Sequence, residues 1–471
     1  MKPSSGCAVA RGAPMIVMNV MTRPLFRTSV VLAPFLALLS ACGGGGSGSS
    51  GNGGGTSTAP PRPGERRILT LTDAASVAVK PNEILTTRAA VARGDDVILF
   101  TPVGGTINGT SDTAAIRLAK DGSVKWARRY RFPELAFVGE VVDDGAGVSF
   151  VAGQDATVYV VRIDDDGAIR AQQAYEVPGA GQLSATVPLT LAPLDDHGLL
   201  VGTGAGVMRL AADGAVMWSN DLGGAPVQRV TVLPGGDFAA VGDIGGMRVA
   251  RFSPDGQARF IGAGGIKGNF FHAGIVPTDD GGVLVLSGVD AASEELVGIV
   301  TGRISADGTT GTLEGVQMDV KDNMGHDVPY QFGSGAHIQR TASGRVWASF
   351  RLSSGVLGAN LHGPVDVAFD SATPTDAVSV AIAFAYTDSA VVGIEPDGLG
   401  KDLVVRAPRP QEGECANQPY NLHTKALATA TYVLVENAKV SPVNATPVDA
   451  LVVADELKAE LSEDMCPGAG S

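Results

Sequence analysis

Cys415 and Cys466 are the residue pair near the end of the chain whose type and spacing point to covalent chemistry. The chain of 471 residues has only four cysteines, and the other two lie in its first 42 residues. In an oxidising compartment an isolated pair favours a disulfide, and closing a loop of this size stabilises a fold by about 4 kcal/mol in the chain-entropy model. A two-thiol metal or redox site is the alternative, but CxxC spacing and a nearby ligand cluster are missing.

A second thiol, Cys42, follows a short apolar stretch at residues 30–39 and the lipobox-like segment Leu39, Ser40 and Ala41, in which Ser40 and Ala41 are small. About ten apolar residues are too few to span a bilayer. Lipid attachment needs small residues before the cleavage point and a thiol after it, because the sulfur carries the diacylglycerol. Residues 1–41 therefore predict a bacterial lipoprotein signal peptide, with Cys42 as the lipid attachment site. An ordinary secretory signal that ends by chance before a cysteine is the alternative.

Residues 42–65 are rich in glycine and serine and then in proline, which predicts a flexible tether with a root-mean-square reach of about 25 Å. Gly43 follows the predicted lipidated cysteine in place of an aspartate, a choice that resembles an outer-membrane lipoprotein in the enterobacterial sorting rule. We therefore expect a lipid-anchored protein of the cell envelope, on the outer membrane of a Gram-negative bacterium.

Catalytic motifs are not evident. The six histidines show no HxxxH or HExxH spacing, and no GxSxG segment joins a strand to a helix. The least regular stretch, residues 321–337, contains His326 and His337 and is the one segment that we expect to contact a ligand. The sequence predicts no catalytic residue, no metal and no cofactor.

The pattern Arg-[Leu/Ile/Phe]-x-x-Asp-Gly occurs five times, at intervals of 45, 47, 42 and 52 residues. Its arginine, aspartate and glycine are Arg117, Asp121 and Gly122; Arg162, Asp166 and Gly167; Arg209, Asp213 and Gly214; Arg251, Asp255 and Gly256; and Arg303, Asp307 and Gly308. A ring of like cations would suit an anionic ligand. Alternatively, each arginine serves its own repeat by bonding turn carbonyls or the nearby aspartate, and we favour this structural interpretation. Asp164, Asp165 and Asp166 form a solvated turn in preference to a calcium loop, because the ligand spacing of such a loop is missing.

These residues are positioned by hairpins. Asp-Gly is typical of a tight turn in which glycine takes the left-handed conformation, and an apolar strand precedes each copy. Between the hairpins lie continuous apolar runs such as residues 147–152 and 282–286, which are typical of strands buried on both faces. A repeat of this length fits one four-stranded blade. We predict an all-β fold, with a β-propeller of six to seven blades at residues 66–410.

Residues 411–471 are expected to form a C-terminal cap or latch that packs on the propeller, with the predicted disulfide closing a loop within this segment. Val453, Leu457, Leu461 and Met465 fall four apart, which predicts a helix that begins near Asp455.

The segments 118–126 and 210–218 each combine leucine, an Asp-Gly turn and a tryptophan. They resemble the repeats of quinoprotein-like (PQQ-type) propellers, over about residues 90–310. In that family the tryptophan docks one blade onto the next, and here two of five hairpins keep it, as Trp126 and Trp218. The adjacent-cysteine disulfide and the calcium site of quinoprotein dehydrogenases are not visible, so the resemblance does not imply their activity. In plan the chain also resembles propeller lipoproteins that act as scaffolds in outer-membrane barrel assembly.

The first 41 residues hold four of the 35 basic residues and none of the 49 acidic ones, so the remaining chain carries a charge of −18. Such an acidic chain disfavours nucleic acid as a partner. We expect a noncatalytic binding or scaffold module, attached to the membrane through its lipid and bound to an envelope protein or glycan. An envelope enzyme, quinone-dependent or hydrolytic, with its site in the propeller channel or on the loop face, is the alternative.

Overall fold

The computed structural model describes residues 65–80, 89–104, 112–154, 156–179, 189–243, 246–264, 269–290, 297–321, 330–340, 346–354, 361–370, 373–379, 383–387, 390–396, 402–408, 421–435 and 440–462. Within these ranges every regular element is a β-strand, as predicted. Among the same residues there is no helix that is long and apolar enough to cross a membrane.

The chain repeats one unit, in which four consecutive antiparallel strands are joined by short connections. The first unit is β3 (Ala89–Arg93), β4 (Asp96–Val103), β5 (Asp112–Leu118) and β6 (Val124–Arg131). The second is β7 (Phe137–Asp143), β8 (Val148–Gln154), β9 (Thr157–Ile163) and β10 (Ile169–Glu176), and the third is β11 (Thr190–Pro193), β12 (Leu199–Gly202), β13 (Val207–Leu210) and β14 (Val216–Asn220). Each recurring Arg-x-x-x-Asp-Gly segment connects the third strand of a unit to the fourth.

The fourth unit is β15 (Val227–Val232), β16 (Phe238–Asp243), β17 (Met247–Phe252) and β18 (Ala258–Gly264). The fifth is β19 (Asn269–Pro277), β20 (Val283–Asp290), β21 (Val297–Ile304) and β22 (Gly311–Lys321), and the sixth is β23 (Tyr330–Arg340), β24 (Val346–Ser354), β25 (Leu361–Asp370) and β26 (Thr373–Ser379). The predicted ligand-contacting stretch ends in β23, and its residues 322–329 lie outside the described residues.

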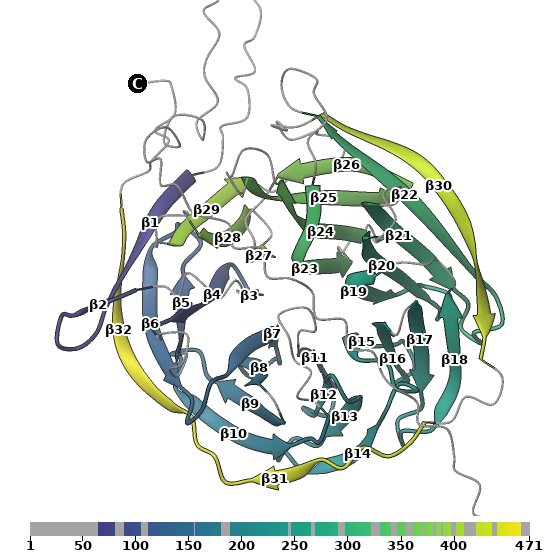
Figure 1. Ribbon diagram of the computed structural model, residues 1–471. Coiled ribbons are helices and arrows are strands. Elements are labelled where there is room, and N and C mark those ends of the chain that lie inside the picture. Colours follow the sequence, from purple (N-terminus) through teal and green to yellow (C-terminus); the bar gives the residue numbers. More distant parts are fainter. Residues whose placement is uncertain are drawn as a thin grey trace, which may run out of the picture. The chain divides into compact units, whose positions relative to one another are not determined.

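The closing unit combines strands from the two ends of this body. β27 (Ala383–Tyr386), β28 (Ala390–Pro396) and β29 (Asp402–Pro408) are completed by β1 (Glu65–Thr72), which pairs with β29 in the register Arg67 to Val404 and carries the short β2 (Ala78–Val79). The first strands of successive units contact one another from β3 to β23, and β27 contacts β3. The sheets are thus arranged around a centre as the blades of a β-propeller (Figure 1).

The core lies between neighbouring units. All eight residues of β4 are buried, as the continuous apolar run predicts. Phe100 of the first unit packs against Phe150 of the second with ring centroids 5.3 Å apart, and Tyr130 also contacts Phe150. Further clusters join the second unit to the third, the third to the fourth, and the fourth to the fifth. Each sheet therefore shields the face of the next from water.

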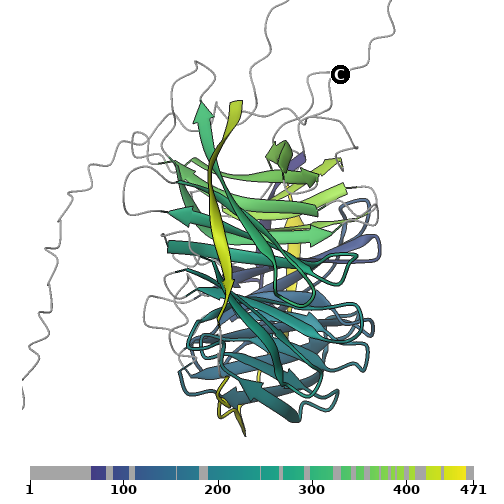
Figure 2. The same cartoon turned by 90° about the vertical axis from the view of Figure 1, so that its right-hand side faces the viewer.

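The last described residues, 421–435 and 440–462, run around the outside of the ring, and we call them the belt. The belt contains β30 (Asn421–Leu434), β31 (Thr446–Val448) and β32 (Val453–Leu461). β30 pairs with β22 and then with β18, β31 pairs with β10, and β32 pairs with β6 and then with β1. Figure 1 shows the belt in yellow on the perimeter, and Figure 2 shows β30 crossing the outer ends of the sheets.

The helix predicted from Asp455 onward is wrong, because residues 453–461 form the strand β32. The spacing of Val453 and Leu457 suggested one apolar helical face, yet Leu457 is buried and Val453 is 55% exposed. The outer strands β6 and β1 offer backbone N–H and C=O groups along their edges, and β32 pairs with both. This edge pairing outweighs the local helical periodicity.

Candidate functional site

The recurring arginines lie where one unit meets the next. Arg117 at the end of β5 donates from Nε to Asp96 Oδ2 at 2.8 Å, within its own unit. Its Nη1 donates to the backbone oxygen of Asp165 at 2.6 Å, in the hairpin turn of the second unit. Trp126 on β6 donates from Nε1 to the same oxygen at 2.8 Å. An arginine and a tryptophan of one unit thus hold the same turn carbonyl of the next.

The arrangement recurs between the third and fourth units. Arg209 donates to Asp196 Oδ2 at 2.7 Å and to the Pro254 oxygen at 2.6 Å, and Trp218 donates to that same oxygen at 2.9 Å. Asn220 adds a hydrogen bond of 2.7 Å to the Gly256 oxygen. Both tryptophans that carry the resemblance to quinoprotein-like repeats therefore contact the following unit.

The other copies vary this plan. Arg251 pairs with Asp237 at 2.7 Å and reaches the Ala306 oxygen of the fifth unit at 2.6 Å. Arg162 donates to the His197 oxygen of the third unit at 2.7 Å, and burial lowers the pKa of its guanidinium. Arg303 pairs with Asp280 at 2.9 Å, and both side chains are more than half exposed. Each arginine directs donors to its own unit or to a neighbouring turn, which favours the structural interpretation.

The glycines of the five turns all have positive φ angles, between 71° and 89°. At Gly256 a β-carbon would also lie 2.7 Å from the ring of Trp218, and at Gly308 it would lie 2.5 Å from the ring of Phe260. Phe260 stands four residues after its turn glycine, as Trp126 and Trp218 do. It is therefore a third docking aromatic, which the search for tryptophan missed and which its spacing would have revealed.

The turn aspartates cap their own turns. Asp121 Oδ1 accepts the Ser123 amide at 2.9 Å, and Asp213 Oδ1 accepts the Ala215 amide at 2.9 Å. Asp307 accepts hydrogen bonds from the Ser305 hydroxyl and the Thr309 amide, which lower its pKa to about 2. The pKa of Asp255 is lowered as well, first by the Ser253 hydroxyl. The ionised form is thereby favoured at Asp255 and Asp307.

The Asp164–Asp165–Asp166 turn uses its groups in the same way. Asp165 pairs with Arg93 and with Arg117, each at 3.1 Å, and these guanidinium groups lower the pKa of its carboxyl. Asp164 accepts the Ala168 amide at 2.8 Å. No group of three or more metal-binding side chains occurs among the described residues.

The innermost strands carry an ion pair that the sequence did not reveal. Glu140 on β7 and Arg229 on β15 belong to the second and fourth units and form a salt bridge, with each side chain 15% exposed. Between them, β11 of the third unit supplies the Thr190 hydroxyl and the Leu191 amide, which donate to Glu140 Oε2 at 2.6 and 2.7 Å. Three consecutive units thus converge on one carboxylate. The only signal in the sequence is a charge in the interior of each of two apolar strands, of which β7 also ends in Asp143.

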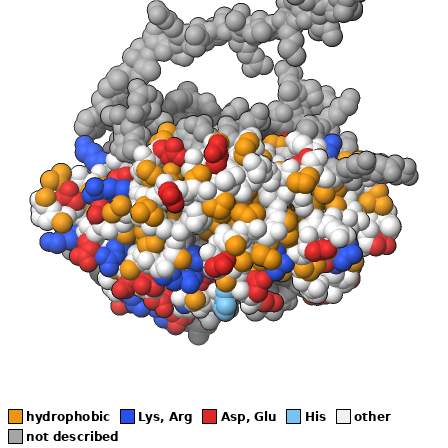
Figure 3. Space-filling view, turned by 90° about the horizontal axis from the view of Figure 1, so that it is seen from below, with side chains coloured by type: hydrophobic (Ala, Val, Ile, Leu, Met, Phe, Trp, Pro, Cys, Tyr) orange, Lys and Arg blue, Asp and Glu red, His pale blue; other side chains and the backbone are white. Residues whose placement is uncertain are grey.

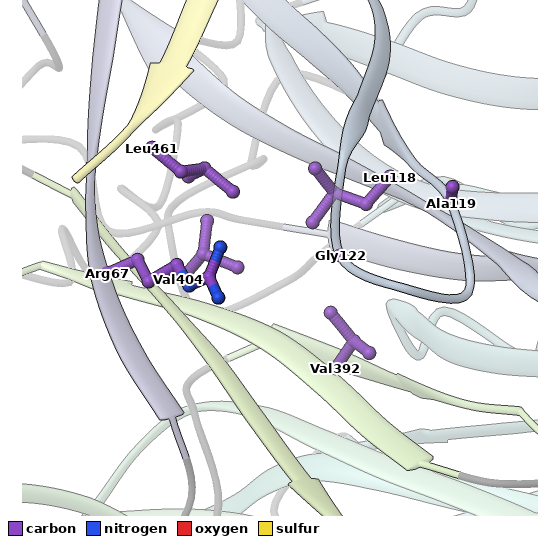
Figure 4. A pocket seen from close by; sticks show the side chains of 7 residues that line it. All are labelled: Arg67, Leu118, Ala119, Gly122, Val392, Val404 and Leu461. Carbon is purple, nitrogen blue, oxygen red and sulfur yellow. The ribbon is translucent and has the colours of Figure 1, made fainter. Parts of the chain in front are cut away.

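A small pocket of about 20 Å³ lies where the closing unit meets the first. Leu118, Ala119 and Gly122 line one side, Val392 and Val404 another, and Leu461 of the belt a third, with the Arg67 side chain alongside Val404 (Figure 4). Apolar groups dominate this lining. The size suits a water molecule and not an organic substrate.

The outer surface shown in Figure 3 mixes apolar side chains with charges of both signs. The predicted lipobox residues Leu39, Ser40 and Ala41, the attachment site Cys42, and the predicted disulfide partners Cys415 and Cys466 lie outside the described residues.

No family model and no curated protein matches the chain. Among solved structures, the chain is similar to a protein of unknown function from Bacteroides caccae, with 15% identity over 57% of this chain and 89% of that chain, and a TM-score of 0.33. It is also similar to the Dos1 propeller, with 11% identity over 70% and 81% of the two chains and a TM-score of 0.39. A third similarity is to the polysaccharide lyase Uly1, with 11% identity over 78% and 89% and a TM-score of 0.27. At these TM-scores the similarities carry no statement about what this chain binds.

Proposed function

We propose that this chain is a lipid-anchored, noncatalytic β-propeller that acts as a binding or scaffold module in the cell envelope. We also propose that the six four-stranded units and the closing unit form a ring of seven blades. The anchor would be the lipid on Cys42, followed by the tether of residues 42–65.

The observation that carries the noncatalytic part is the use of the central charges. Glu140 is held by Arg229, by the Thr190 hydroxyl and by the Leu191 amide, so its carboxylate joins three units. A general acid or base would need its carboxyl turned toward a substrate. Four of the five repeated arginines likewise donate to a backbone oxygen of the next unit, and Arg303 pairs within its own unit. Polar groups in the described body thus serve cohesion between units, which suits a rigid binding platform.

The anchored part is supported by the order of the segments. A predicted signal peptide, a lipidation cysteine and a flexible sequence precede β1, whose first residue is Glu65. The folded body thereby starts where the tether sequence ends. We propose an outer-membrane location and an envelope protein or glycan as the partner.

The anchor is tested with Cys42→Ala in the full-length chain. We expect the wild-type protein to incorporate a labelled fatty acid and to sediment with membranes, and the variant to do neither. A Cys42→Ala protein that still carries label would contradict the lipoprotein assignment. Ser40→Ala keeps a small residue before the cleavage point and serves as the control, with labelling retained.

The partner is tested by crosslinking in intact cells, followed by purification of the propeller from the envelope. We expect that one protein or glycan is recovered reproducibly with the wild type and is not recovered with the Cys42→Ala control. Crosslinks that are absent, or that occur equally with the unanchored control, would contradict a scaffold role at the membrane.

We further propose that Cys415 and Cys466 form a disulfide. Mass spectrometry of unreduced mature protein should show the two peptides linked. Thiol labelling of both residues before reduction would exclude the bond.

A further inference from the structure

The belt crosses the outer strands of six units. It passes from the fifth unit to the fourth through β30, and it bridges the third unit where Asp221 donates to the Ser441 oxygen at 2.9 Å and Val443 donates to the Ser219 oxygen at 2.9 Å. It then pairs with the second unit through β31, and with the first and closing units through β32. Every unit has its four strands without the belt, so the belt is an addition to the ring.

The two ends of the belt are held by different forces. Near the end of β30, Tyr432 is 7% exposed and lies against Gly262 and Gly311, where any β-carbon would collide with its ring. Ten register pairs join β30 to β22. This end is anchored by apolar burial and by a long backbone ladder, neither of which is sensitive to salt.

At the other end, β32 combines nine register pairs, five with β6 and four with β1, with a cluster of opposite charges. β6 carries Arg128, Arg129 and Arg131, and β32 places Asp455 and Glu456 opposite them. Asp455 lies 2.5 Å from Arg131 and 3.5 Å from Arg129, and Glu456 lies 2.8 Å from Arg128. Glu456 is 82% exposed, so water and salt reach its pair with Arg128, whereas Asp455 is 33% exposed and its Oδ2 atom, which faces Arg129 and Arg131, is buried.

Burial at this end is modest. Leu457 is the only buried residue of β32, and Val453 at the start of the strand is 55% exposed. Just before β32, Val452 is buried, and its backbone is gripped by the Gln172 side chain, which accepts from its amide at 2.6 Å and donates to its oxygen at 3.1 Å. These two hydrogen bonds at Val452 separate the preceding part of the belt, which they hold in place, from β32, which follows.

β32 also joins the two sides of the ring closure. Its residues 453–457 pair with β6 of the first unit, and its residues 458–461 pair with β1 of the closing unit. Without β32, the outer edges of β6 and of residues 69–72 of β1 lose their hydrogen-bonding partner. Open strand edges of this kind exchange their amide hydrogens rapidly and accept other strands.

We propose that β32 is a releasable strap, held by the ionic latch of Asp455 and Glu456 on β6, whose release uncovers the outer edges of β6 and β1 where the closing unit meets the first unit. The belt up to Val452 stays in place during this release, because Tyr432 is buried near the end of β30 and the Gln172 side chain holds the Val452 backbone. The strap is independent of the proposed scaffold role, since it follows from pairing and charge alone.

The test is amide hydrogen exchange, read by mass spectrometry on peptides from β32, β1, β6 and β16. Asp455→Arg places a cation among three arginines, so β32 and residues 69–72 of β1 should exchange about tenfold faster, with β16 unchanged. Glu460→Arg is the matched control, because it makes the same charge change on the same strand opposite Thr70. The double variant Asp455→Arg, Arg131→Asp restores an opposite pair and should restore slow exchange.

A second experiment uses the wild-type chain, so that no substitution can disturb its folding. Raising the salt to about 1 M shortens the screening length to about 3 Å and should speed exchange in β32 but not in β30 or β4. The proposal is overturned if Asp455→Arg exchanges no faster than Glu460→Arg, if the charge swap fails to restore protection, or if salt leaves β32 unchanged.

Discussion

Glu140 and Arg229, 89 residues apart in the chain, form a salt bridge that links the innermost strands of the second and fourth units over the third. The Glu140 carboxylate has two further partners, because the Thr190 hydroxyl and the Leu191 amide of the intervening unit donate hydrogen bonds to it. Three consecutive units are therefore joined at their innermost strands by one carboxylate that receives donors from the two units after its own.

Arg229→Met should destabilise the fold by about 2–4 kcal/mol, because it leaves the Glu140 carboxylate without its countercharge in a poorly hydrated position. The double variant Glu140→Gln, Arg229→Met should recover much of that loss, since the amide keeps the hydrogen bonds from β11 without a charge. Urea unfolding followed by tryptophan fluorescence measures both. Equal losses for the single and the double variant would show that the charge pairing does not matter.

The arginines of the repeat are not equivalent. Arg117→Lys should cost about 1–2 kcal/mol, because a lysine cannot bond Asp96 and the Asp165 oxygen at once. Arg303→Lys, at a pair that is more than half exposed, should cost less than about 0.5 kcal/mol. Thermal unfolding of the two variants gives the comparison. A loss at Arg303 as large as that at Arg117 would contradict the role of the inter-unit hydrogen bond.

Alanine substitutions at two turn glycines distinguish the cost of backbone strain from the cost of a packing clash. Gly235→Ala meets open space at φ +93°, so only the strain of a left-handed alanine, about 1–2 kcal/mol, is expected. Gly256→Ala, at φ +85°, would in addition press a methyl group against Trp218 at 2.7 Å, and should cost about 1–3 kcal/mol more. The difference between the two unfolding free energies measures the docking contact. Equal costs would mean that the third and fourth units adjust without loss.

Much of this architecture was accessible from the sequence, for a physical reason. Each unit is specified by local signals, namely an Asp-Gly turn and an apolar run, and these are repeated often enough to identify the period. Contacts between units were harder to predict. Glu140 and Arg229 carry no mark that pairs them, and Phe260 was missed because tryptophan alone was sought.

The belt shows the opposite case, where a local signal misled. Val453, Leu457 and Leu461 have helical spacing, but the segment meets two strand edges that only the assembled ring provides. Asp455, where the helix was predicted to begin, and Glu456 face a strand with three arginines. Non-local complementarity of this kind is invisible until the fold brings β6 and the C-terminal segment together.

The turn carboxylates predict how the fold responds to acid. In the folded state the pKa of Asp307 and of Asp280 is lowered to about 2, each first by a neighbouring hydroxyl that donates to it. A carboxyl with a depressed folded pKa contributes stability above its unfolded pKa of about 4, and this contribution disappears as the pH falls from about 4 to about 2. Asp307→Asn keeps an acceptor oxygen for the turn but cannot titrate. The stability of the variant relative to wild type should therefore rise as the pH is lowered through this window, as measured by urea unfolding at a series of pH values. Asp121→Asn, at a turn with the same amide cap, tests whether the effect belongs to this hairpin position in general, and a pH-independent difference at Asp307 would contradict the assigned pKa.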